Sequence, residues 1–449
     1  MLRPSSVCRK GPREEVFSTF GPIRPIDPGA EHGHPLPVKQ LPGGMRSVAA
    51  AVAIAVAACG SPLAPSPDGA GFASDPGAGL SSMSLPSPSP VPAAGHELYG
   101  FVPYWEMDDT IAAHVAASPL TTLGLFSVSS TSKGPLDTAQ RGYRRITGDV
   151  GAAMIRAAHR RGTRVELVFT SFGASRNTAF FARTSVQDAT IASLVALVGR
   201  LGVDGVDVDV ESLDIGLVDA YGAFVGRLRS ALVAAQPGAT VSVATGAGPT
   251  GVAMAATALA AGADRVFLMG YDYRTGSSEP GAVSPIARAD GGASLSGTLD
   301  LYAVMGIPPQ RLLLGLPLYG MAWPVTGPMV GAPSTGNGTA WIPRRHADVL
   351  TGPGAMPAND PLEGVDVYFV GSDGSLAPPS PMPSSDPPPD GRTWSAVYVD
   401  SPATLGRKLG LGESRGLVGA GFWAIGYERG LPSYTALMNR FVAGDVAPS

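Results

Sequence analysis

Short apolar runs alternate with amphipathic stretches along the chain from residue 96 onward. Eight of the apolar runs end at turn residues and predict strands at 98–103, 122–128, 164–170, 203–210, 240–245, 265–271, 311–317 and 420–425. Helical periodicity lies between them, at 148–161, 187–200, 214–235, 251–262, 295–305 and 403–415. Strands that alternate with helices favour a parallel sheet, so we expect an α/β fold, a (β/α)₈ TIM barrel. An open doubly wound sheet is the alternative, but no Gly-x-Gly-x-x-Gly loop opens a helix after an early strand.

The connection between the seventh and eighth predicted strands is longer than the others. It includes residues 324–395, which contain the Pro-rich tract 377–390, and we expect an insertion with some structure of its own there. Connections of this length in a folded domain are usually functional or disordered. Because loops that follow barrel strands lie at the face where such enzymes keep their sites, the insertion is predicted to form a wall of a substrate cleft.

The N-terminal part of the chain has a different pattern. Residues 1–44 are polar and Pro-rich, and then come Arg46, an apolar run at 48–58 and Cys59. A positive charge, a short apolar run and small residues before a cysteine are typical of a bacterial secretory signal. The residues that end at Cys59 also resemble a lipobox. The apolar run is too short to span a bilayer as a permanent helix.

We therefore interpret residues 1–58 as an upstream extension and a lipoprotein signal peptide, with Met45 as the natural start. Cys59 is the expected lipid attachment site, which predicts an exported, membrane-anchored protein of the cell envelope or the extracellular space. Residues 59–95 are rich in Ser, Pro, Gly and Ala and predict a flexible linker, with the folded domain over 96–449. The alternative is an ordinary buried apolar helix with an incidental cysteine.

Composition narrows the choice of partners. The net charge is −4 and no basic or aromatic-basic run occurs, so nucleic acid is not an expected partner. The two cysteines are Cys8 and Cys59, so a domain that follows the linker has no disulfide and depends on a large core. His114, His159 and His346 match no metal-ligand spacing. We expect no metal, no cofactor and a monomer.

One strand carries the candidate chemistry. In Asp204-Gly-Val-Asp-Val-Asp-Val-Glu211, the acids Asp207, Asp209 and Glu211 alternate with valines. Side chains on a strand alternate between faces, so the three acids point one way and the valines the other. Buried like charges are unfavourable, which favours a functional row over a solvated acidic edge.

The end of a barrel strand places its last acid at the mouth of the barrel. Glu211 is expected there, with Asp209 and then Asp207 deeper inside. Ionised neighbours raise the pKa of Glu211 and hold it protonated near neutral pH, as cleavage of a glycosidic bond requires. A Ca²⁺ or Mg²⁺ site is the alternative use of three acids. Acids about 6–7 Å apart along one strand suit a stacked column better than one coordination sphere.

The acid row resembles a known signature. Asp204-Gly-x-Asp-x-Asp-x-Glu211 is similar to the Asp-x-x-Asp-x-Asp-x-Glu motif of glycoside hydrolase family 18, which comprises chitinases and related peptidoglycan-active enzymes. Five further segments resemble family strands in the right order: Tyr99 to Trp105, Ser171-Phe-Gly173, Met269 to Tyr273, Leu314 to Trp323, and Gly421-Phe-Trp423. The resemblance covers about residues 96–440 and implies a TIM barrel.

The resemblance also implies a substrate-assisted retaining mechanism. Glu211 would protonate the leaving oxygen while the 2-acetamido oxygen of the substrate attacks the anomeric carbon. Asp209 would stabilise the resulting oxazolinium ion, Asp207 would share a proton with Asp209, and Tyr271 would orient the acetamido group. The implied substrate-binding residues are Asp272, Trp423, Tyr104, Ser171, Gly173 and Arg274.

Two departures from the family pattern bear on substrate preference more than on activity. Arg274 stands where a His is frequent in relatives, and Phe172 lies where a smaller residue is common. We expect hydrolysis of β-1,4-linked N-acetylglucosamine polymers such as chitin. An N-acetylglucosaminidase that acts on peptidoglycan is an alternative, and a catalytically silent sugar-binding protein is another.

Overall fold

The computed structural model describes residues 95–379 and 392–446. Eight parallel strands close into a barrel in the order β1-β14-β7-β6-β5-β4-β3-β2. Their bounds are β1 Glu97–Pro103, β2 Thr122–Val128, β3 Arg164–Phe172, β4 Gly205–Glu211, β5 Thr240–Thr245, β6 Arg265–Met269, β7 Leu312–Pro317 and β14 Gly419–Trp423. The predicted TIM barrel is therefore confirmed, and each predicted strand coincides with one of these eight within a few residues.

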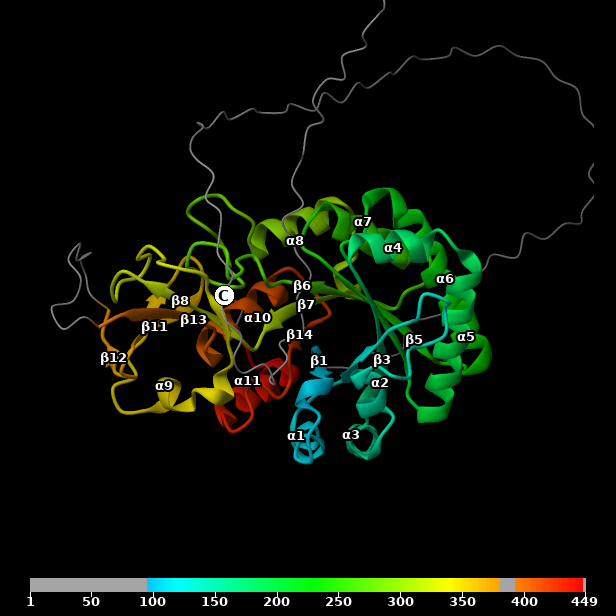
Figure 1. Ribbon diagram of the computed structural model, residues 1–449, viewed down its shortest axis with the longest axis horizontal. Coiled ribbons are helices and arrows are strands. Elements are labelled where there is room, and N and C mark those ends of the chain that lie inside the picture. Colours follow the sequence, from blue (N-terminus) through cyan, green and yellow to red (C-terminus); the bar gives the residue numbers. More distant parts are fainter. Residues whose placement is uncertain (1–94, 380–391, 447–449) are drawn as a thin grey trace, which may run out of the picture. The chain divides into compact units, whose positions relative to one another are not determined.

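Helices cover the outside of the barrel (Figure 1). The α-helices are α1 Ile111–Ala117, α2 Arg141–Ile146, α3 Asp149–His159, α4 Ala174–Phe181, α5 Thr184–Leu201, α6 Val218–Ala235, α7 Pro249–Ala260, α8 Leu295–Val304, α9 Ala347–Thr351, α10 Pro402–Ser414 and α11 Pro432–Ala443. Short 3₁₀ turns are η1 Tyr104–Glu106, η2 Ile215–Leu217, η3 Pro309–Arg311 and η4 Pro343–Arg345. The six predicted helices correspond to α3, α5, α6, α7, α8 and α10.

Aromatic rings fill the middle of the barrel. Phe101 packs against Tyr99 with a centroid distance of 4.7 Å and against Phe267 at 4.8 Å. Glycines on the neighbouring strands β7 and β14 leave room for these rings. A Cβ atom at Gly315 would lie 2.6 Å from Cζ of Phe267, and one at Gly421 would lie 2.5 Å from the same ring. The barrel is thus a packed core whose polar groups need partners of their own.

The insertion is a second, antiparallel sheet in the order β10-β11-β13-β8-β9, with β12 paired to β11. Its strands are β8 Gly320–Val325, β9 Thr339–Trp341, β10 Ala358–Asp360, β11 Val365–Gly371, β12 Leu376–Ala377 and β13 Trp394–Val399. In Figure 1 these strands gather on one side, beside α9 and α10. The sheet extends from Gly320 to Val399, so the insertion is wider than the predicted 324–395, because β8 begins directly after β7 and pairs along β13.

Several predictions fall on other parts of the chain. Cys59, the segment 1–58 and the Pro-rich residues 380–391 lie outside the described residues, as does the linker 59–95 apart from its last residue. Among the helices that are described, none combines the length and apolarity that a membrane crossing requires.

Candidate active site

The acid row lies on β4 as the alternating pattern predicts. Asp207 is 0% exposed and Asp209 is 5% exposed, whereas Glu211, at the C-terminal end of the strand, is half-buried. Val206, Val208 and Val210 are buried on the opposite face. The row therefore descends from the mouth of the barrel into its interior.

Burial and the charges of neighbouring acids raise the pKa of each acid in the row. Burial raises the pKa of Asp209 well above its usual range, and the charges of Glu211 and Asp207 raise it further. Burial also raises the pKa of Glu211 to about 7, with a further contribution from the charge of Asp272. An acid with this pKa is partly protonated at neutral pH, as a general acid must be.

The loop after β6 supplies a second acid next to Glu211. Asp272 has a positive φ of 59°, a conformation that Asp tolerates better than most residues, and its carboxylate accepts a hydrogen bond from the Tyr319 hydroxyl. Tyr271 is buried and its ring meets that of Tyr319 edge-on, with a centroid distance of 6.3 Å. Proximity to Asp209, Asp272 and Glu211 helps raise the pKa of the Tyr271 hydroxyl, after the larger effect of burial, so Tyr271 stays protonated and able to donate.

Tyr319 is a site residue that the sequence pattern does not predict. It lies in the segment between β7 and β8 that resembles a family strand, but nothing in that segment indicates which carboxylate its hydroxyl reaches. The partner is 47 residues away in the chain, so the contact appears only in the fold.

Trp423 ends β14 and lies among aromatic side chains. Its half-buried ring contacts Phe126 edge-on at 4.6 Å, Phe101 at 5.8 Å and Trp105 at 6.2 Å. Tyr104 packs against Trp105 at 4.9 Å. Trp423 and Tyr104 therefore lie in one aromatic cluster next to the barrel mouth.

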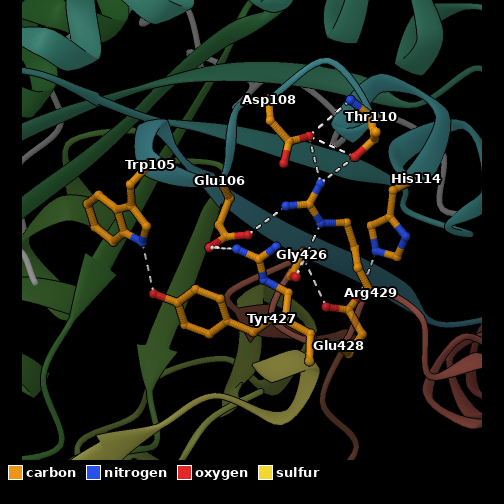
Figure 2. Close-up of polar contacts among 10 residues, drawn as sticks. Trp105, Glu106, Asp108, Thr110, His114, Gly426, Tyr427, Glu428 and Arg429 are labelled. Atoms are coloured by element: carbon orange, nitrogen blue, oxygen red, sulfur yellow. Dashed lines mark hydrogen bonds and ion pairs between the residues drawn. The ribbon is translucent and has the colours of Figure 1, made fainter. Parts of the chain in front are cut away.

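A hydrogen bond from the loop after β14 fixes this cluster. The indole N–H of Trp105 donates to the hydroxyl of Tyr427 at 3.1 Å, as Figure 2 shows. The carbonyl of Tyr427 in turn accepts the backbone N–H of Arg344, in the η4 turn of the insertion, at 2.8 Å. The insertion therefore reaches the loops that carry the aromatic cluster.

An ion-pair network reinforces the same junction (Figure 2). Glu106 is 1% exposed and accepts hydrogen bonds from Arg344 and Arg429, both at 2.9 Å. Arg429 also donates to Asp108 at 2.7 Å. The network joins the loops after β1 and β14 to the insertion.

Ser171 does not face the acid row. Residues that pair in register on neighbouring strands share a face, and Ser171 pairs with Val210, whereas Phe172 pairs with Glu211. Its hydroxyl donates to the side-chain oxygen of Asn177 in α4 at 2.7 Å. The predicted substrate contact of Ser171 is therefore contradicted by the parity of the strand.

Gly173 and Asn177 instead hold the backbone at the end of β4. The N–H of Gly173 and the side-chain amide of Asn177 both donate to the carbonyl of Glu211, at 3.2 and 2.6 Å. Gly173 has a φ of 96°, which a glycine adopts without strain. Nothing in the sequence pattern indicates this role of Asn177, since α4 is not among the predicted helices.

Arg274 also differs from its predicted role. It is buried, and both of its terminal guanidinium nitrogens donate to Glu363, at 2.6 Å each. This buried bidentate pair, with a further bond from Nη1 to the carbonyl of Ala282 at 3.5 Å, holds the guanidinium inside the fold. Arg274 joins the loop after β6 to the insertion, and we correct its assignment as a substrate-binding residue accordingly.

Comparison with known proteins gives the family. Residues 152–428 match the family described as glycosyl hydrolases family 18. A Nod factor hydrolase of Medicago truncatula is 29% identical over 175 residues, which cover 37% of this chain and 39% of the relative. An endochitinase of Brugia malayi is 25% identical over 173 residues, 35% of this chain and 34% of the relative. The chain thus matches about two fifths or less of the length of these curated relatives.

Solved structures share the fold at low identity. The spore cortex-lytic enzyme SleL of Bacillus cereus has a TM-score of 0.58 at 18% identity, covering 78% of this chain and 76% of that one. A family 18 chitinase of Cycas revoluta in complex with (GlcNAc)₃ has a TM-score of 0.62 at 17% identity, covering 78% and 99%. Together with the barrel and its acid row, the match over residues 152–428 establishes that this chain belongs to family 18 of the glycoside hydrolases.

Proposed function

We propose that this glycoside hydrolase cleaves β-1,4-linked N-acetylglucosamine polymers with substrate assistance and retention of configuration. One observation carries the proposal: Glu211, with a pKa raised to about 7, lies at the barrel mouth directly above the buried Asp209. An acid that holds its proton at neutral pH, above a second acid buried in the barrel, suits protonation of a leaving group next to a developing cation.

The proposed reaction gives a role to each of these residues. Glu211 donates its proton to the glycosidic oxygen as the bond to the anomeric carbon breaks. The 2-acetamido oxygen of the substrate forms a bond to that carbon, and Asp209 accepts a hydrogen bond from the acetamido N–H and balances the positive charge. Tyr271 donates to the acetamido oxygen. Water then attacks the anomeric carbon, and the bond from the acetamido oxygen to that carbon breaks, which restores the acetamido group. The Glu211 carboxylate takes a proton from the attacking water, which restores the acid.

The ring under attack is proposed to stack on Trp423. Trp423 offers its ring for stacking within an aromatic cluster, and we expect the carboxylate of Asp272 to accept a hydrogen bond from a sugar hydroxyl. Both lie on strand ends or the loops that follow them, where family enzymes bind substrate.

The proposal is tested by its requirement for the acetamido group of the substrate. The purified protein is incubated with chito-oligosaccharides and with the same oligomers after N-deacetylation, and early products are analysed by mass spectrometry and by NMR of the anomeric proton. Cleavage of the acetylated oligomers alone, with the β-anomer formed first, supports the proposal. Equal cleavage of the deacetylated oligomers would refute substrate assistance.

Peptidoglycan is the second candidate substrate. The support is a fold similar to that of an enzyme named for lysis of the spore cortex. Purified peptidoglycan in the same assay separates the two: release of fragments with reducing N-acetylglucosamine, and no cleavage of chito-oligosaccharides, favours a wall-remodelling role. Binding to both glycans without hydrolysis of either favours a sugar-binding protein.

We further propose that the protein is exported and anchored through lipid on Cys59, a residue outside the described part of the chain. The support is the lipobox-like sequence before it. Incorporation of a tagged fatty acid by the wild-type chain and its loss in Cys59→Ala supports anchoring. Equal labelling of both proteins contradicts it.

A further inference from the structure

A fourth acid lies inside the barrel beneath the catalytic row. Glu166 is on β3, is 2% exposed, and pairs in register with Gly205, the residue two positions before Asp207 on the neighbouring strand. It is therefore one inward position deeper than Asp207. No part of the proposed reaction uses it.

Three hydroxyl groups converge on the Glu166 carboxylate. Thr240 donates to Oε1 at 2.6 Å and Ser242 donates to the same oxygen at 3.1 Å, both from β5. Tyr99, from β1, donates to Oε2 at 3.0 Å. Hydrogen bonds donated to a carboxylate stabilise its charged form.

Asp207 is in the opposite situation. Neither of its carboxylate oxygens has a hydrogen-bond partner among the described residues. Burial raises its pKa well above the usual range, and the charge of Glu166 raises it further. Burial raises the pKa of Glu166 too, but the three hydroxyls and the charge of Arg164 act against that rise. Of the two acids, Glu166 is the better placed to be ionised.

Charged and titratable groups surround Glu166 on several strands. They are Tyr99 on β1, Arg164 on its own strand β3, Asp207 on β4, and Arg265 on β6. Arg265 is itself paired with Glu97, with a distance of 2.7 Å between Nε and Oε2. The two arginines favour the ionised form of Glu166, and the Glu97 charge offsets part of the effect of Arg265.

We propose that Glu166 is a positioning residue of the acid row: a buried anion, held by three hydroxyls, that keeps a proton on Asp207. A neutral Asp207 places no negative charge beside Asp209, so Asp209 ionises more readily to face the positive charge of the reaction. The proton stays on Asp207, and no proton is transferred to or from Glu166. The catalytic use of this arrangement rests on the proposed function, whereas the protonation of Asp207 does not.

The test is a pH titration of the Asp207 carboxyl, in which infrared difference spectroscopy measures its protonation. A protonated carboxyl gives a C=O band, and the band that is absent from Asp207→Asn is assigned to Asp207. In Glu166→Gln, which keeps the shape and removes the charge, the midpoint of that band is expected to fall by about one pH unit or more. An unchanged midpoint in the folded variant would overturn the proposal.

Tyr99→Phe is the milder variant, in case Glu166→Gln fails to fold. It removes one of the three hydroxyls, so Glu166 gains a proton more easily and the Asp207 midpoint falls by a smaller amount. Tyr302→Phe is the matched control, since this buried tyrosine donates to Gly246 and contacts Thr245 instead of Glu166. A shift in the control equal to that in Tyr99→Phe contradicts the proposal.

A purely structural role for Glu166 gives a different result. It predicts a lower melting temperature in Glu166→Gln with no change in the Asp207 midpoint, and that outcome overturns the proposal. The pH dependence of kcat/KM is the second measurement, and its acid limb should move to lower pH in Glu166→Gln. If the wild-type protein hydrolyses no acetamido polymer, the proposed function fails while the infrared titration still decides the role of Glu166.

Discussion

The hydroxyl of Tyr319 donates a hydrogen bond to the carboxylate of Asp272, and this bond lowers the pKa of Asp272 against the larger effect of burial. The charge that is kept on Asp272 raises the pKa of Glu211 in turn. A tyrosine on one loop thus influences the protonation of the proposed general acid on another strand.

The alkaline limb of the activity profile should depend on this relationship. Glu211 is active when protonated, so activity falls as the pH rises through its pKa of about 7. In Asp272→Asn the neighbouring negative charge is absent, the pKa of Glu211 falls toward that of an ordinary Glu, and the limb moves to lower pH by about half a unit to one unit. The pH dependence of kcat measures it, and a limb that stays in place contradicts the coupling.

Tyr319→Phe should move the limb in the same direction by less. Without the hydrogen bond the pKa of Asp272 rises, so Asp272 is neutral over more of the pH range and raises the pKa of Glu211 less. The same pH series tests this, and a shift to higher pH would show that the sign is wrong.

The hydroxyl of Tyr427 should matter for substrate affinity. Tyr427→Phe leaves the indole N–H of Trp105 without its partner and frees the ring that packs against Trp423. A loss of about 1 kcal/mol corresponds to a rise in KM of about fivefold with little change in kcat. Tyr434→Phe is the matched control, because that hydroxyl bonds the carbonyl of Asp400. Equal kinetics of the two variants would argue against the positioning of Trp105.

The buried pair of Arg274 and Glu363 should contribute to stability. Both side chains are about 10% exposed, so Glu363→Gln leaves a buried guanidinium without its counter-charge and destabilises the fold by about 3–5 kcal/mol. Asp290→Asn removes the more exposed partner of Arg288 and is expected to change stability by less than about 1 kcal/mol. Denaturant unfolding of both variants measures the contrast, and similar midpoints would refute it.

Two glycines give a contrast in packing. A Cβ at Gly315 would lie 2.6 Å from Cζ of Phe267 and 2.6 Å from the carbonyl oxygen of Leu268, so Gly315→Ala should destabilise the barrel by about 1–3 kcal/mol. Gly199, inside α5, would have nothing within 4 Å of an added Cβ, so Gly199→Ala should stabilise by about 0.5–1 kcal/mol. Thermal unfolding distinguishes the two, and stabilisation by Gly315→Ala would contradict the described packing.

Local patterns explain why the barrel and its acid row could be predicted. Alternation of Val with Asp and Glu along β4 fixes the face of each acid, and helical and strand periods recur around the barrel. The pairing of β3 with β4 sets Ser171 beside Val210, and Ser171 therefore lies on the outer face. The predicted strand ends at residue 170, so the sequence pattern assigns Ser171 to neither face.

Contacts between distant segments could not be predicted in this way. Arg274 meets Glu363 across 89 residues, and β8 pairs with β13 across the whole insertion. The sequence does mark Glu166 as unusual, because it is a single acid between the apolar Val165 and Leu167 in a predicted barrel strand. Its partners come from β1 and β5, however, and only the closed barrel brings them together.

The central claim is that Glu211 is the acid of a substrate-assisted glycosidase. Its most direct test compares wild-type protein with Glu211→Gln on N-acetylglucosamine oligomers and on peptidoglycan, with hydrolysis measured by mass spectrometry and binding measured by calorimetry. The account predicts that Glu211→Gln loses hydrolysis by a factor of about 100 or more while it binds the same glycan with similar affinity. Near-normal hydrolysis by Glu211→Gln would contradict it.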